Sequence, residues 1–277
     1  MRRIVYLWCF LGMCFNHSGN AYAKDERWAV YYLAELPPQA FMAYDTLVFD
    51  ADVHPDITPL LQEGKTLLAY ISIGEVGDYR PYFKTLQEQE AILEVNPHWQ
   101  GAFYLDVRSP YWQRFVTDEL IPGILQKGFH GVFLDTVDTP VELERRDPEG
   151  RAGMRVATIR LIKSIRQRYP DMPVMMNRGY GILPQVGKDI TLLLGESVYT
   201  THDAGAIYKK VAFEAYQSHK ALLLEARRLN PQLKIYTLDY WEPEDRETIR
   251  EIYTEERRNG FIPYVATRNL DSVIPEQ

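Results

Sequence analysis

Short apolar runs alternate with helix-like segments along most of the chain. Eight of these runs are rich in Val, Ile, Leu, Phe and Thr, and between several of them apolar residues recur every three or four positions. A strand that is apolar throughout is buried on both faces, as in a parallel sheet that is covered by helices. We therefore predict eight parallel strands, at Trp28–Leu33, Thr46–Asp50, Thr66–Ile73, Gly131–Thr136, Pro173–Asn177, Thr191–Ser197, Lys234–Asp239 and Phe261–Ala266.

Four of the intervening segments carry helix signals. Ser109 is a suitable N-cap and Pro110 a suitable first residue for a helix that ends before Gly128. A last helix is predicted to start at Pro243 and to end at Gly260. Two further helices are predicted from apolar stripes, one through Val156, Ile159, Ile162, Ile165 and Tyr169 and one through Tyr208, Val211, Ala215, Leu222 and Ala226.

This order of strands and helices predicts an α/β fold. Eight strand–helix units in about 250 residues fit a closed (β/α)8 barrel, the TIM barrel, as one domain. A doubly wound open sheet is the alternative, but the glycine-rich phosphate-binding turn that follows its first strand is missing here. We therefore predict a single (β/α)8 domain over residues 24–277.

Residues 1–23 have the layout of a secretory signal peptide. Met1–Arg3 is basic, Ile4–Phe15 is almost entirely apolar, and Ala21–Ala23 offers a small-x-small cleavage site. The apolar run is too short for the roughly 20 residues that a membrane-spanning helix needs. We therefore predict cleavage after Ala23 and an exported protein, periplasmic or extracellular, without stable membrane insertion.

Composition narrows the possible classes of function. Cys9 and Cys14 both lie in the predicted signal peptide, so the mature chain has no thiol for a disulfide, a metal site or a nucleophile. The same cleavage removes Arg2 and Arg3 and takes the formal net charge from −7 to −9. An acidic surface repels phosphate backbones, which argues against nucleic acid as a partner. The aromatic content of 13% suits stacking on sugar rings, although most tyrosines are expected in ordinary packing.

Polar residues, mainly acidic, follow nearly every predicted strand. Active sites of (β/α)8 barrels are built at the carboxyl ends of the strands, so these residues are expected to share one rim. A single loop carboxylate is more often a helix cap or an ion-pair partner, but their accumulation on one rim favours a functional site. The candidates are Asp50, Ser72, Glu75, Asp135, Asp138, Asn177, Glu196, Asp239 and Tyr240.

Asp135 and Glu196 stand out among these candidates. Each follows directly on an apolar strand and shares the side-chain parity of an apolar neighbour, Phe133 and Leu194 respectively. If that parity faces the lumen, the two carboxylates point into one mouth from strands that a single strand separates. A pair of carboxyl groups flanking a bond is the minimum that glycoside hydrolysis needs, and one of them must be protonated.

Other common chemistries leave weaker signals. The histidines lack metal-ligand spacing, and the sequence has neither a G-x-S-x-G elbow nor a glycine-rich nucleotide loop. No cofactor and no metal is therefore expected. The segment Asp50–His54 is the one arrangement that a metal-dependent deacetylase could use, although no second histidine is placed to complete it.

Several strings at the predicted strand ends resemble glycoside hydrolase family 114, the endo-α-1,4-polygalactosaminidases. They occur in the same order as in that family and span roughly Trp28 to Thr267, nearly the whole predicted mature chain. The strings are Ala69–Glu75 with Tyr79–Tyr82, Asn96–Gly101, Tyr104–Asp106, Pro110–Trp112, Gly128–Asp138, Asn177–Gly179, Glu196–Ser197 and Asp239–Tyr240.

The resemblance implies a barrel that hydrolyses α-1,4-linked galactosamine polymers from within, including the related Pel-type exopolysaccharide of biofilms. By the same resemblance Asp135 and Glu196 match the two catalytic carboxylates, with Asp135 as nucleophile and Glu196 as acid/base; the reverse order stays open. The residues expected to line the cleft are Tyr70, Ser72, Glu75, Tyr79, Arg80, Asp106, Asn177 and Tyr240, and Asp50, Asp138 and Asp239 are further acidic candidates for binding a partly deacetylated, cationic polymer.

The linkage itself favours a nucleophile supplied by the enzyme. In an α-galactosaminide the 2-nitrogen lies on the same face as the leaving group and cannot attack from behind, so we expect retention through an ester of Asp135. Two alternatives stay open: a barrel that binds the polysaccharide without cleaving it, and a metal-dependent deacetylase. Shortening of the polymer chains distinguishes the hydrolase from the first, and dependence on a divalent metal would indicate the second.

Overall fold

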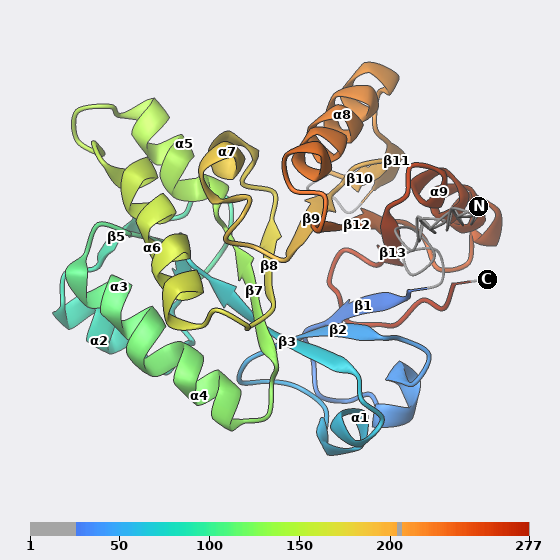
Figure 1. The fold of residues 1–277 in the computed structure, drawn as a ribbon, viewed down its shortest axis with the longest axis horizontal. Helices are drawn as coiled ribbons and strands as arrows, with labels where there is room; N and C mark the ends of the chain where they lie inside the picture. The colour runs from blue at the N-terminus through green and yellow to red at the C-terminus, as the bar shows by residue number, and fades with distance from the viewer. Residues whose placement is uncertain (1–25, 204–206, 277) are drawn as a thin grey trace, which may run out of the picture.

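Eight parallel strands form the centre of the molecule in the computed structural model, which describes residues 26–203 and 207–276 (Figure 1). Every strand lies within two residues of its predicted bounds, so the predicted (β/α)8 fold is confirmed. The predicted signal peptide, residues 1–23, lies outside the described residues and stays a prediction. In the order of the sheet, the strands are β1 (Trp28–Tyr31), β2 (Thr46–Asp50), β3 (Thr66–Ser72), β7 (Gly131–Asp135), β8 (Val174–Asn177), β9 (Leu192–Glu196), β12 (Lys234–Tyr240) and β13 (Ile262–Ala266).

The barrel closes by packing between its first and last strands. β1 and β13 are in contact but do not form a ladder of hydrogen bonds. The Trp28 ring stands edge-on to Tyr264, 5.7 Å between ring centroids, and to Tyr236, at 5.4 Å. Just beyond the strands, the backbone N–H of Tyr32 donates to the carbonyl of Leu270 at 3.1 Å. Aromatic packing thus fills the seam from the inside, and the chain beyond β13 covers it.

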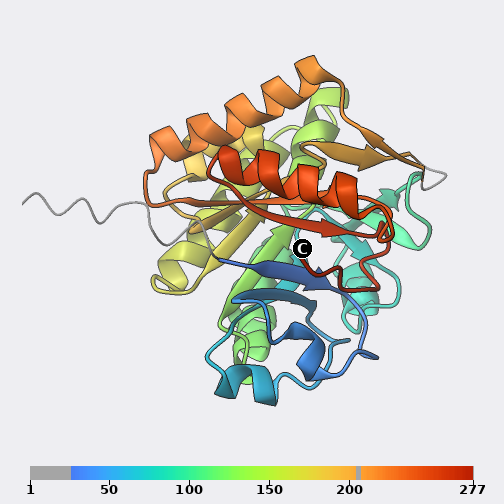
Figure 2. The ribbon, with the colours of Figure 1, turned by 90° about the vertical axis from the view of Figure 1, so that its right-hand side faces the viewer.

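Helices surround the sheet on its outer side (Figures 1 and 2). In Figure 2, α8 and α9 run side by side, and the Tyr216 hydroxyl on α8 donates to Glu255 on α9. None of the helices within residues 26–203 and 207–276 is long and apolar enough to cross a membrane. The α-helices are α1 (Thr58–Gln62), α2 (Phe83–Glu88), α3 (Pro110–Phe115), α4 (Ile121–Gln126), α5 (Asp138–Arg146), α6 (Met154–Arg168), α7 (Leu183–Val186), α8 (Phe213–Leu229) and α9 (Arg246–Arg258), and the short helical turns are η1 (Pro38–Phe41), η2 (Val116–Leu120) and η3 (Tyr180–Ile182).

The predicted helix signals are partly confirmed. The Ser109 hydroxyl caps α3 by accepting from the backbone N–H of Trp112, and α3, η2 and α4 form one helical run that ends at Gln126. The last helix starts at Arg246, three residues after Pro243, because the Asp245 side chain caps it there.

Both predicted apolar stripes are wrong in part. Positions 156 and 165 are about two and a half turns apart and therefore lie on opposite sides of α6, which leaves Val156 55% exposed while Ile165 is buried. Tyr208 lies in the strand β11 (Tyr208–Lys210), and Leu222 on α8 is 43% exposed. The buried residues are instead Met154, Ala157, Thr158, Leu161, Ile162 and Ile165 on α6, and Tyr216, Leu223 and Ala226 on α8.

Two small antiparallel sheets extend the barrel at the carboxyl ends of its strands. One follows β3 and consists of β4 (Glu75–Gly77), β5 (Ile92–Val95) and β6 (Ala102–Leu105), in the order β4-β6-β5. The other, which follows β9, pairs β10 (Thr200–His202) with β11. Both lie at the same end of the barrel, on the right in Figure 2, and so add to the walls of its mouth.

Candidate active site

Asn177 joins the two carboxylates that the sequence singles out. Its Nδ2 donates to Asp135 Oδ1 at 2.9 Å and to Glu196 Oε2 at 2.7 Å. The three residues end β7, β8 and β9, which are neighbours in the sheet, and all three side chains point into the mouth. These two carboxylate oxygens can lie no further apart than the sum of the two distances, 5.6 Å.

A tyrosine donates to the other oxygen of each carboxylate. The Tyr70 hydroxyl on β3 lies 3.0 Å from Asp135 Oδ2, and the Tyr240 hydroxyl at the end of β12 lies 2.7 Å from Glu196 Oε1. Burial and the nearby carboxylates raise the pKa of both hydroxyls well above the usual value, so both remain donors throughout the working pH range. Each carboxylate is thus held at both oxygens, which fixes its orientation.

Opposing effects act on the pKa of Asp135, and the net shift is upward. Burial raises the pKa of Asp135, and the negative charge of Glu196 raises this pKa further. The hydrogen bonds from Asn177 and Tyr70 act in the opposite direction. A nucleophilic Asp135 acts in its ionised form, which these two hydrogen bonds stabilise.

The backbone is strained directly after each of these three strand ends. Thr136, Arg178 and Ser197 have φ angles of 56°, 54° and 54°, in the left-handed region that non-glycine residues rarely adopt. Such a conformation costs on the order of 1–3 kcal/mol per residue. These left-handed residues end the strands directly after Asp135, Asn177 and Glu196.

A buried ion pair borders the site on the β2 side. The Arg80 guanidinium binds both oxygens of Asp50 and also contacts Asp52 at 3.1 Å. It lies 5.8 Å from the centroid of the Tyr70 ring and 5.1 Å from that of Tyr79. Tyr79 itself is 74% exposed, so its ring is free to contact a substrate. Arg80 thus neutralises Asp50 and connects it to the tyrosine that binds Asp135.

Ser72 and Glu75 connect β3 to the small sheet beside the mouth. The Ser72 hydroxyl donates to the carbonyl of Glu75 at 2.8 Å and lies 2.8 Å from the Thr136 hydroxyl. The Glu75 carboxylate accepts from Asn96 and from the hydroxyl of Thr139, at 2.8 and 2.7 Å. Both donors are neutral, so the hydrogen bonds of these two oxygens leave the charge of Glu75 uncompensated.

Three predicted cleft residues lie in environments that differ from those of Asp135 and Glu196. Asp106 is paired with Arg108 at 2.8 Å, which lowers its pKa against the effect of burial. Asp138 begins α5, and burial raises its pKa. Asp239 does not face the mouth: it is fully buried behind β12, where it accepts from the backbone N–H groups of Tyr199 and Thr200. Adjacent residues of a strand face opposite sides, so Tyr240 and Asp239 cannot both line the cleft.

Sequence reasoning missed several residues around the two carboxylates. The Tyr32 ring, just after β1, packs at 5.0 Å against Tyr70, and the charges of Asp135 and Glu196 help to raise its pKa. The His202 ring packs edge-on at 4.9 Å against Tyr240. The Arg178 guanidinium donates to the carbonyl of Glu196 at 3.1 Å. Tyr32 and Arg178 each stand next to a strand end, and this position could have identified them from the sequence. No such pattern marks His202.

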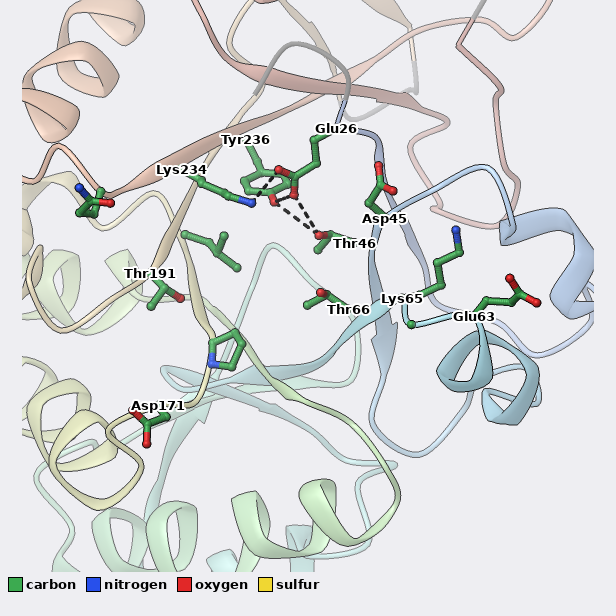
Figure 3. Close-up of a pocket in the computed structure, with 14 residues that line it drawn as sticks. Glu26, Asp45, Thr46, Glu63, Lys65, Thr66, Asp171, Thr191, Lys234 and Tyr236 are labelled. Carbon is green, nitrogen blue, oxygen red and sulfur yellow. Dashed lines mark hydrogen bonds and ion pairs between the residues drawn. The ribbon is translucent and has the colours of Figure 1, made fainter. Parts of the chain in front are cut away.

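A second hollow, of about 730 Å³, lies at the opposite end of the barrel. It is lined by residues at the amino ends of the strands, where Lys234 and Tyr236 both bind Glu26 and Thr46 donates to it at 3.2 Å (Figure 3). In (β/α)8 barrels this end serves stability and the carboxyl end carries the chemistry. We assign the candidate active site to the rim that holds Asp135 and Glu196.

The metal alternative has no support in the contacts of Asp50–His54. Asp50 is bound by Arg80, Asp52 is shared between Arg80 and Lys127, and the His54 ring packs against Phe129. Across residues 26–203 and 207–276, no three His, Cys, Asp or Glu side chains are grouped as metal ligands.

The family comparison agrees with this geometry. The family model described as glycoside-hydrolase family GH114 matches residues 16–276. The chain belongs to glycoside hydrolase family GH114. It is therefore a glycosidase, and the rim with its paired carboxylates is the expected location of the active site of a GH114 barrel.

Relatives of this GH114 chain occur in distant organisms. An uncharacterized protein of Thermotoga maritima is 27% identical over 236 residues, which cover 78% of this chain and 69% of the relative. An uncharacterized protein of Deinococcus radiodurans is 26% identical over 224 residues, covering 78% and 68%.

Solved structures resemble the GH114 barrel over most of its length. The glycoside hydrolase domain of PelA from Pseudomonas aeruginosa is 26% identical, with a TM-score of 0.78, and the match covers 89% of this chain and 96% of that domain. Aspergillus fumigatus Ega3, solved in complex with galactosamine, is 14% identical with a TM-score of 0.67, over 94% and 99% of the two chains. At that identity the likeness to Ega3 concerns the fold.

Proposed function

We propose that the chain is an exported, endo-acting glycosidase that cleaves α-1,4-linked polymers of galactosamine and N-acetylgalactosamine, such as a Pel-like exopolysaccharide, with retention of configuration. The observation that supports the mechanism best is the bridge through Asn177. It holds Asp135 Oδ1 and Glu196 Oε2 no more than 5.6 Å apart. Retaining glycosidases place their two carboxyl groups about 5–5.5 Å apart, whereas inverting enzymes leave about 6.5–9.5 Å for a water molecule. The spacing here favours retention.

The reaction proceeds in two steps. In the first, an oxygen of Asp135 forms a bond to C1 of the sugar, the glycosidic C1–O bond breaks, and Glu196 gives its proton to the leaving oxygen. In the second, a water oxygen bonds to C1, the ester to Asp135 breaks, and Glu196 takes the proton of that water. Tyr70 and Asn177 orient the attacking carboxylate, and Tyr240 and Asn177 orient the acid.

Two observations support an amino-sugar polymer as the substrate. The glycoside hydrolase domain of PelA resembles this chain with a TM-score of 0.78, and Ega3 was solved in complex with galactosamine. Within the mouth, Asp50 is paired with Arg80 and Asp106 with Arg108, so these two charges are already compensated. The negative charge that remains for an ammonium group is that of the Asp135–Glu196 pair, Glu75 and Asp138.

The first experiment incubates the mature protein with a partly deacetylated α-1,4-galactosamine polymer and sizes the products by mass spectrometry. We expect oligosaccharides from the wild type and none from Asp135→Asn or Glu196→Gln. Glu142→Gln is the matched control, because Glu142 lies exposed on α5 and pairs only with surface arginines. Intact polymer from the wild type, with binding retained, would indicate a binding protein instead.

A second experiment assigns the roles of the two carboxylates. With an α-galactosaminyl fluoride as substrate, azide can replace the missing carboxylate of an alanine variant. Asp135→Ala with azide should give the β-glycosyl azide, because azide then attacks from the nucleophile's side. Glu196→Ala with azide should give the α-azide, because azide then attacks the glycosyl ester. The opposite pattern, read by NMR, would exchange the two roles.

A further inference from the structure

An open pocket of about 470 Å³ is lined in part by Glu196. Its volume lies within the usual range for small-molecule sites. Glu196 lines it, but Asp135, Asn177 and Tyr70 do not. The other lining residues come from the loops after β7, β8 and β9 and from α8: Asp138, Arg178, Tyr180, Ser197, Thr201, Val211, His219 and Leu222.

The walls of this pocket combine a fixed cation with groups that are available for a ligand. The Arg178 guanidinium is held by the carbonyl of Glu196, and nearby acidic groups raise its pKa against the effect of burial. The Nδ1 atom of His219 on α8 is buried and has no hydrogen-bond partner in the structure. Buried polar atoms are normally paired, so an unpaired one beside a pocket points to a ligand atom as its partner.

The position of Glu196 decides which part of a substrate the pocket would hold. In the proposed reaction Glu196 gives its proton to the oxygen that leaves, and that oxygen belongs to the sugar that departs first. The sugar attached to Asp135 must lie over the Asp135 carboxylate, and therefore outside this pocket. The pocket, which Glu196 lines and Asp135 does not, is where the departing part of the chain can lie.

We propose that this pocket is the subsite for the leaving sugar, an amino sugar of the polymer, and that His219 and Asp138 are specificity-determining residues that hold it there. His219 Nδ1 pairs with a hydroxyl or amino group of that sugar, and the Asp138 carboxylate accepts from its 2-amino group. The proposal rests on the proposed glycosidase function and adds to it the location of the departing sugar.

The test compares two substrates that differ in their leaving group. An α-1,4-galactosamine oligosaccharide places a sugar in the pocket, whereas α-galactosaminyl fluoride places none there. For His219→Ala and Asp138→Asn we expect kcat/KM on the oligosaccharide to fall about tenfold or more, as for a lost hydrogen bond to a bound substrate. Hydrolysis of the fluoride should stay within about twofold of wild type, because its departing group needs no such bond.

Ser218→Ala is the matched control, since Ser218 precedes His219 on α8 and its exposed hydroxyl only donates to the carbonyl of Glu214. We expect this variant to behave as wild type on both substrates. Equal losses on both substrates in the His219 and Asp138 variants, or no loss on either, would overturn the proposed subsite while leaving the glycosidase function in place. A wild type that cleaves neither substrate would overturn the proposed function, and the subsite with it.

Discussion

Asn177 lies 2.7 Å from Glu196 and directs a hydrogen of its amide at that carboxylate, while its own Oδ1 is buried without a partner in the structure. An amide oriented in this way exposes only donors to the two acidic groups. It therefore stabilises negative charge on either carboxylate and, in the proposed retaining mechanism, fixes the spacing between them.

Asn177→Ala should reduce kcat for polymer cleavage by about 10²–10³-fold, the usual effect of removing one preorganised donor from an active site. The fold should survive because no backbone contact depends on this side chain. Initial rates and the thermal midpoint should be measured together, with Asn269→Ala as control, because Asn269 is exposed and donates to Asp271 at the surface. A loss of less than about threefold would mean that the bridge does not position the carboxylates.

The two tyrosines offer a way to read the pH profile. Removing a donor to an ionised carboxylate raises its pKa. With Asp135 acting ionised, Tyr70→Phe should move the acidic limb of kcat/KM upward, whereas Tyr240→Phe should leave that limb in place because its hydroxyl donates to Glu196. Each variant should also lose about tenfold or less in rate. If Tyr70→Phe moves the alkaline limb instead, Asp135 is the acid and the two roles are exchanged.

Strand parity explains how far the site could be predicted from the sequence. Once Asp135 and Glu196 were placed at the ends of apolar strands, alternation put both in the lumen, and the structure places them there together with Asn177. The same rule should have rejected Asp239, because Tyr240 is its neighbour and faces the mouth. Strand ends are local information, which is why the eight strands were predicted almost residue by residue.

Residues that reach the site from loops and helices were harder to predict. His219 stands in the middle of α8 and lines the same pocket as Glu196 because that helix packs beside β9. Nothing in its neighbouring residues reports this packing, which depends on contacts between distant parts of the chain. The apolar stripe that predicted a buried Leu222 was wrong for the same reason. It depended on which side of α8 packs against the sheet, and the local sequence does not determine that side.

We expect Arg80 to contribute strongly to the stability of the folded protein. Its ion pair with Asp50 is buried, with side-chain exposures of 7% and 12%. Arg80→Met would leave Asp50 uncompensated, and breaking a buried pair in this way costs about 3–5 kcal/mol. Urea unfolding measures the effect. Arg145→Met is the matched control, because its pair with Glu142 is exposed and worth about 1 kcal/mol or less. Similar small losses in both variants would show that the Asp50 pair contributes little.

The last prediction concerns two carboxyl groups outside the mouth. Asp239 and Glu256 are both fully buried between β12 and α9, and neither Oδ2 of Asp239 nor either oxygen of Glu256 has a hydrogen-bond partner in the structure. Burial, with the charge of Asp239 as the next cause, raises the pKa of Glu256 to about 9, and burial raises the pKa of Asp239 to about 7. Glu256 is therefore protonated in the folded protein at neutral pH.

The sign of the pH dependence follows from these pKa values. In the unfolded chain Glu256 loses its proton near its ordinary pKa of 4.5, whereas the folded protein keeps that proton up to about pH 9. Between these limits the folded state binds more protons, so the free energy of unfolding falls as the pH rises. Glu256→Gln removes this titration. The variant should match wild type near pH 5 and be more stable near pH 8, as measured by urea unfolding at both values. Glu247→Gln, at an exposed position of α9, is the control. A wild type whose stability is flat from pH 5 to pH 8 would contradict the buried pair's role.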